Sequence, residues 1–104
     1  MEAKKIVKAK ILSNRSLATN IMEMKLQVPE VSSLAKPGQF VNVYIDDKSL
    51  ILPRPISICD ADEEVLTLIY AVVGKGSLWM SECAAGQEIR VSTPMGNGFD
   101  LSAL

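Results

Sequence analysis

The sequence contains no histidine, only two cysteines and few aromatic residues, which make up 5% of its 104 positions. Without histidine, the commonest general base and any Ser-His or Cys-His nucleophile pair are missing, so no catalytic residue is assigned. Cys59 and Cys83 cannot hold zinc or an iron–sulfur cluster by themselves, so no metal site is expected. The two residues are interpreted as small buried thiols in a reducing compartment. Any redox chemistry would therefore depend on a bound cofactor.

An excess of charge of one sign is also lacking, because 11 Lys and Arg stand against 12 Asp and Glu, which gives a net charge of -1. This balance does not indicate a nucleic-acid or anionic-membrane partner. The chain does not open on a signal-like segment, and its apolar runs are too short to cross a bilayer, so a cytoplasmic protein is expected. With 48% hydrophobic residues, the length suits one domain with one core.

Alternation of apolar and polar residues predicts six strands. They are Lys4–Asn14, Ala18–Val28, Gln39–Asp46, the segment Leu50–Cys59, Val65–Val73 and Gln87–Thr93. One short helix is predicted over Leu78–Glu82, with Gly76 or Ser77 near its N-cap. Because β-rich chains with strands at this spacing usually close on themselves, we expect an all-β fold, a six-stranded antiparallel Greek-key barrel with a helix between strands five and six.

Turn-forming residues separate these strands. Asn14-Arg15-Ser16 is expected to connect the first two strands, Pro37-Gly38 suits a type II turn, and Asp60–Glu64 is expected to form an acidic turn. Two prolines flank Arg54 inside the fourth strand. Since proline cannot donate to a sheet ladder, this strand is predicted to lie at an edge or to leave its ladder near Arg54, where the backbone could face a ligand.

Several residues could contact a ligand, and each also has a purely structural interpretation. Gly74-Lys75-Gly76-Ser77 lies between a predicted strand and helix, where backbone N–H groups favour phosphate, but such glycine pairs are common in ordinary loops. Arg54 could hold pyrophosphate, or it could simply protect a sheet edge from aggregation. Ser57 could hydrogen-bond a flavin ring, or its hydroxyl could be hydrogen-bonded within the barrel. Tyr70 and Trp79 could stack on an aromatic ligand or pack in the core.

Four segments occur in a distinctive order: Pro37-Gly38-Gln39-Phe40, Arg54-Pro55-Ile56-Ser57, Tyr70-Ala71-Val72-Val73-Gly74-Lys75-Gly76-Ser77 and Pro94-Met95-Gly96-Asn97-Gly98-Phe99. The set resembles the ferredoxin-reductase superfamily, and within it the electron-transfer subunits of class B dihydroorotate dehydrogenases. The resemblance covers essentially the whole chain. It implies FAD as cofactor, bound through Arg54, Pro55, Ile56, Ser57, Tyr70, Gly74, Lys75, Gly76 and Ser77. Many superfamily members carry tyrosine in place of Ile56 and threonine in place of Ser77.

The family pattern continues with an NAD-binding domain and a cysteine cluster for a [2Fe–2S] centre, neither of which lies within these 104 residues. The resemblance therefore implies that residues 1–104 form one FAD-binding β-barrel domain, which would not be active alone and would hold neither NAD nor the cluster. It also implies a partner, the catalytic subunit of dihydroorotate dehydrogenase. The complete subunit of the family passes electrons between NAD and that partner in pyrimidine biosynthesis.

The sequence leaves two other functions and one other assembly open. The chain could be the flavin domain of an NADPH:ferredoxin or sulfide-dehydrogenase-type reductase, or a cofactor-free β-barrel binding module. It could also form an inactive homodimer through an apolar face that a further domain would otherwise cover.

Overall fold

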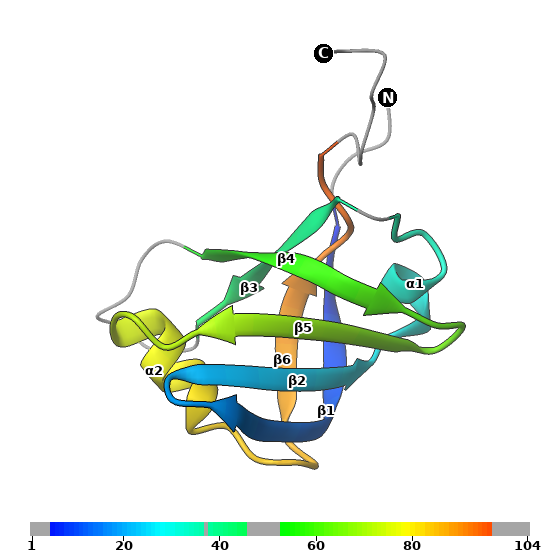
Figure 1. Ribbon diagram of the computed structural model, residues 1–104. Helices are drawn as coiled ribbons and strands as arrows, with labels where there is room; N and C mark the ends of the chain where they lie inside the picture. Colours follow the sequence, from blue (N-terminus) through cyan, green and yellow to red (C-terminus); the bar gives the residue numbers. More distant parts are fainter. Residues whose placement is uncertain (1–4, 37, 46–52, 97–104) are drawn as a thin grey trace.

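The computed structural model of the protein describes residues 5–36, 38–45 and 53–96 (Figure 1). Its elements, in chain order, are β1 (Ile6–Ala18), β2 (Ile21–Gln27), α1 (Pro29–Ser32), β3 (Phe40–Tyr44), β4 (Arg54–Ala61), β5 (Val65–Ala71), α2 (Lys75–Ser81) and β6 (Glu88–Ser92). The strands close into a barrel in the order β1-β2-β5-β4-β3-β6, and all neighbouring pairs are antiparallel. The predicted six-stranded antiparallel barrel is confirmed.

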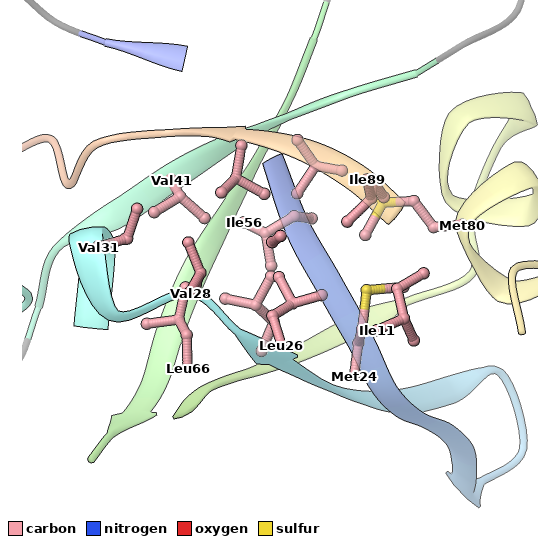
Figure 2. Close-up of a cluster of buried hydrophobic side chains, with 14 of the residues drawn as sticks. Ile11, Met24, Leu26, Val28, Val31, Val41, Ile56, Leu66, Met80 and Ile89 are labelled. Atoms are coloured by element: carbon pink, nitrogen blue, oxygen red, sulfur yellow. The ribbon is translucent and has the colours of Figure 1, made fainter. Parts of the chain in front are cut away.

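The interior of the barrel is filled by the apolar side chains of the alternating patterns. In β2, Met24 and Leu26 are fully buried while Lys25 between them is exposed, as a half-buried strand requires. Figure 2 shows how residues from different strands meet in one cluster. Its members include Ile11, Met24, Leu26, Val28, Val31, Val41, Ile56, Leu66, Met80 and Ile89. Burial of this apolar surface is the main term that stabilises the fold.

The wall of the barrel contains three bulges among the described residues. One extra residue interrupts the pairing at Leu12 and at Leu17 in β1, and another at Cys59 in β4. A bulge increases the local twist and bend of a strand, which a closed barrel needs. All three bulge residues are exposed.

The turn between the first two strands is not where the sequence predicted it. Asn14-Arg15-Ser16 lies inside β1 and pairs with β2, and the chain reverses instead at Thr19–Asn20. Asn20 has a φ of 59°, a left-handed conformation that asparagine tolerates better than other side chains. The bulges let β1 continue past Asn14 while it curves, and local turn chemistry does not reveal this.

Other boundaries also differ from the expectations. The acidic turn is shorter than predicted, since β4 runs on to Ala61, and α1 was not predicted at all. Two expected features are partly confirmed: β5 is a central strand between β2 and β4, and Gly38, with φ of 85°, lies in a turn closed by the Gln39 N–H on the Lys36 carbonyl at 3.2 Å. Pro37, Lys4, Asp46, Leu50–Leu52 and Asn97–Phe99 lie outside the described residues.

The expectation of two buried thiols is wrong for one of them. Cys59 is exposed at the bulge of β4, and Cys83 is half-buried after α2. Burial raises the pKa of the Cys83 thiol, and the nearby charge of Glu82 adds to this effect.

The two helices lie at opposite ends of the barrel (Figure 1). Over residues 5–36, 38–45 and 53–96, neither helix is long and apolar enough to cross a membrane. The end that carries α2 also carries the start of β4, and most of the predicted ligand residues lie there.

Candidate functional site

The first half of β4 is paired with a strand on one side only. Residues Arg54–Ser57 pair with β3, whereas the pairing of β4 with β5 begins at Ile58, opposite Leu68. Among the described residues, Arg54–Ser57 has no partner on the β5 side. This confirms the prediction that the strand leaves its ladder near Arg54, because Pro53 and Pro55 cannot donate there. The backbone of this segment is therefore open to a ligand.

Side chains alternate along this open segment. Ile56 is 9% exposed and belongs to the core (Figure 2), whereas Pro55 and Ser57 are exposed. Ser57 lines a pocket of about 380 Å³, together with residues that include Lys36, Cys59 and Asp60.

Arg54 lies against the first turn of α2. The N-cap of α2 is Gly74, in an extended conformation, and Lys75 and Gly76 begin the helix. A Cβ added at Gly76 would come within 2.9 Å of both Cγ and Cδ of Arg54. Glycine is therefore required for the stem of Arg54 to lie on the helix backbone. This contact joins the two predicted ligand-binding segments, which are more than fifteen residues apart in the sequence.

Ser77 shapes the start of α2 from inside. It is 2% exposed, and its hydroxyl accepts hydrogen bonds from the N–H groups of Val73 (2.8 Å) and Gly74 (3.1 Å) and donates to the Gly74 carbonyl (3.2 Å). A hydroxyl can donate one hydrogen bond and accept two, so these bonds satisfy it completely. The helix begins at Lys75, three residues before the predicted start at Leu78, so Ser77 is its third residue, and its buried side chain orders the preceding loop.

Tyr70 and Asn14 connect the barrel to the other end of α2. The Tyr70 hydroxyl donates to Oδ1 of Asn14 at 2.8 Å, and Nδ2 of Asn14 donates to the carbonyls of Met80 (2.8 Å) and Cys83 (2.9 Å). Tyr70 is 4% exposed, and this burial raises its pKa to about 12. The ring of Tyr70 thus packs in the core, which is the alternative that the sequence left open.

Sequence reasoning missed Asn14, which it assigned to a turn. The only available signal was a polar side chain at the end of an alternating strand, and that signal does not distinguish a turn from a buried hydrogen-bonding residue. Its partners lie 56 to 69 residues further along the chain. Only the closed barrel brings them to Asn14.

The predicted ligand residues therefore divide into two groups. The exposed ones, which a ligand could touch, are Arg54, Pro55, Ser57, Gly74 and Lys75. The buried ones, which shape the site from inside, are Ile56, Tyr70, Gly76 and Ser77. The one ion pair among the described residues joins Arg15 to Glu23 on the β1–β2 hairpin, at 2.9 Å. No described carboxylate therefore neutralises Arg54 or Lys75, and the site favours an anionic ligand.

Known proteins resemble this chain in sequence. The electron transfer subunit of dihydroorotate dehydrogenase B (NAD(+)) from Fusobacterium nucleatum is 38% identical over 103 residues, which cover 96% of this chain and 40% of the relative. The same subunit from Streptococcus mutans is 38% identical over 96 residues, which cover 90% of this chain and 37% of the relative. The chain thus spans about two fifths of the length of these relatives. No protein-family model matches the chain.

Solved structures share the barrel. The NADH-dependent reduced ferredoxin-NADP oxidoreductase, studied for flavin-based electron bifurcation, superposes with a TM-score of 0.81 at 25% identity, over 88% of this chain and 34% of that one. A ferredoxin NADP+ reductase from Neisseria gonorrhoeae with bound FAD and NADP superposes with a TM-score of 0.75 at 22% identity, over 92% of this chain and 40% of that one.

The strand order and these superpositions place the chain in the class of ferredoxin-reductase-like barrels. Within that class it is a homologue of the electron transfer subunits of dihydroorotate dehydrogenase B. The resemblance predicted from the four sequence segments is confirmed.

Proposed function

We propose that this chain is a flavin domain that binds FAD and takes part in electron transfer between NAD and a dihydroorotate-oxidising partner subunit. The relatives' names support the assignment, because they describe electron transfer subunits of an NAD-linked dihydroorotate dehydrogenase. The observation that carries the proposal is the contact of Arg54 with Gly76, since it joins a cation, an open strand edge and a helix start in one place.

The residues present fit FAD. Arg54 supplies a guanidinium for the pyrophosphate, and the first-turn N–H groups of α2, which have no acceptor within the helix, add further donors. Ser57 supplies a hydroxyl, and the open edge of Arg54–Ser57 supplies backbone groups, for the polar edge of the ring. Buried residues hold these groups in place from the core side of the site. They are Ile56, Tyr70, Gly76 and Ser77. When bound, the flavin supplies the redox chemistry, because it accepts a hydride and releases single electrons.

The first test is FAD titration of the purified chain, followed by visible absorbance and flavin fluorescence. We expect saturable binding in the parent and about 10- to 100-fold weaker binding in Arg54→Ala, the range that one or two lost charge-assisted hydrogen bonds imply. An Arg54→Ala variant that binds FAD as tightly as the parent contradicts the assignment of Arg54.

Two glycine variants provide a matched pair for the same titration. Gly76→Ala forces the side chain of Arg54 to move, because the new Cβ would lie 2.9 Å from its carbons, so FAD affinity should fall. Gly74→Ala adds a Cβ that meets no protein atom within 4 Å, on backbone that any residue adopts, so it leaves Arg54 in place; a loss of FAD affinity in this variant would therefore report direct contact of the ligand with Gly74 and not a displaced Arg54. Absence of flavin binding in the parent would favour the cofactor-free binding module instead.

A second candidate function is the flavin domain of a ferredoxin- or NADP-linked reductase. It is favoured by the superposition with the NADH-dependent reduced ferredoxin-NADP oxidoreductase at 25% identity. Copurification from the native host would separate the two, since a dihydroorotate-oxidising partner supports the first function and a ferredoxin-linked partner the second.

Four points remain predictions. They are the partner subunit, the organisation of residues 1–104 as one FAD domain, the cytoplasmic location and a homodimer of the chain. Size-exclusion chromatography at several concentrations tests the homodimer. Co-expression with a dihydroorotate dehydrogenase catalytic subunit, followed by pull-down, tests the partner.

A further inference from the structure

Asn14 uses every hydrogen-bonding group of its side chain between the barrel and α2. Its oxygen accepts from Tyr70 on β5, and its two amide protons go to the carbonyls of Met80 and Cys83 at 2.8 and 2.9 Å. Carbonyls at a helix C-terminus lack partners within the helix. A side chain from β1 thus fastens the C-terminal end of α2.

The opposite end of α2 is fastened by Ser77, whose hydroxyl binds the N–H groups of Val73 and Gly74. Between the two ends, Met80 is fully buried and Trp79 packs against the core. A helix of seven residues is too short to be stable alone, so its position depends on these anchors.

α2 has little room to move where it contacts β4. Arg54 lies on the backbone at Gly76 so closely that a single added methyl group would come within 2.9 Å of it. A shift of α2 would therefore change where the guanidinium of Arg54 points. The anchor and this contact lie at opposite ends of the same short helix.

We propose that Asn14, with Tyr70, is a positioning residue for the anionic part of the cofactor, because it holds α2 in the place that orients Arg54. This inference rests on the proposed function and deepens it, since neither residue needs to touch the ligand. It predicts a specific loss: binding of a ligand that carries the pyrophosphate weakens, whereas binding of the ring alone does not.

The decisive variant is Asn14→Asp, which keeps the shape and the acceptor for Tyr70 but loses both donors to α2. We expect FAD affinity to fall about 5- to 20-fold and riboflavin affinity to stay within about twofold, because riboflavin lacks the pyrophosphate that Arg54 would hold. Tyr70→Phe, which keeps the donors but removes one bond of Asn14, should show a smaller loss of the same kind.

Trp79 reports on α2 without any flavin. It is the only tryptophan of the chain and lies half-buried on this helix. Iodide should quench its fluorescence more strongly in Asn14→Asp than in the parent. The matched control is Asn42→Ala, which removes a part-buried asparagine from β3 whose amide nitrogen donates to the sulfur of Met95, at 4.0 Å. That control should change neither quenching nor the ratio of FAD to riboflavin affinity.

Each outcome decides the inference. A selective loss of FAD affinity together with stronger quenching supports it. Unchanged quenching, or equal losses for FAD and riboflavin, overturns it. If the parent binds no FAD, the proposed function fails separately, and the quenching experiment alone decides whether Asn14 holds α2. If Asn14→Asp does not fold, Tyr70→Phe carries the same comparison.

Discussion

Tyr70 makes the stability of this barrel depend on pH, because its hydroxyl keeps its proton to a higher pH in the folded state than in the unfolded state. Its buried hydroxyl, hydrogen-bonded to Asn14, ionises only near pH 12, whereas an unfolded tyrosine ionises near pH 10. Between these values the unfolded state loses its proton first. The stabilisation from Tyr70 is therefore complete below about pH 10 and is lost as the pH rises towards 12.

Urea unfolding of the parent and of Tyr70→Phe tests this at the residue scale. At pH 9 the variant should be less stable by about 1 to 3 kcal/mol, because Asn14 loses a partner at a part-buried site. At pH 11.5 the difference between the two proteins should be smaller, since only the parent loses stability through this hydroxyl. A difference that is independent of pH would contradict the buried, proton-retaining state of Tyr70.

The β1–β2 hairpin shows what decides a turn at the scale of an element. Asn20 adopts a φ of 59°, and its carbonyl accepts the N–H of Val72 at 2.8 Å, so the hairpin tip also holds the exit of β5. This exit leads directly into Gly74 and α2. A strained tip would therefore affect both the hairpin and the neighbouring candidate site.

Substitution at the tip gives a matched pair. Asn20→Ala should lower the free energy of unfolding by about 1 kcal/mol, because alanine in the left-handed region is strained. Asn20→Gly should stay close to the parent, since glycine adopts this conformation freely. Thermal unfolding of the three proteins measures both effects, and equal stability of the alanine and glycine variants would refute the assignment of the turn.

The described residues close into a barrel around a shared core, so stability is distributed over its strands. Leu68 is fully buried and stands opposite Met24 on one neighbouring strand and Ile58 on the other. Leu12 is the same residue type but lies at a bulge with 41% of its surface exposed. The two leucines differ in environment and not in chemistry.

Comparison of Leu68→Ala with Leu12→Ala measures this difference. The first should cost about 2 to 5 kcal/mol, because it removes buried methyl groups and leaves a cavity. The second should cost about 1 kcal/mol or less, as is usual at exposed positions. Chemical denaturation should show one cooperative transition in each case. A small effect of Leu68→Ala would mean that the core tolerates the gap by rearranging.

The sequence by itself determined the number of strands, the closed barrel and the opening of β4 near Arg54. These features depend on local rules: alternation selects strands, and proline removes a ladder donor wherever it stands. The four ordered segments also indicated the class of protein.

Only the tertiary structure decided how the site is assembled. The bulges moved the first turn past Asn14, and Ser77 turned its hydroxyl inward. The contact of Arg54 with Gly76 and the bonds of Asn14 to α2 join residues far apart in the chain. Local propensity carries no information about such partners, because closure of the barrel and packing of its core bring them together.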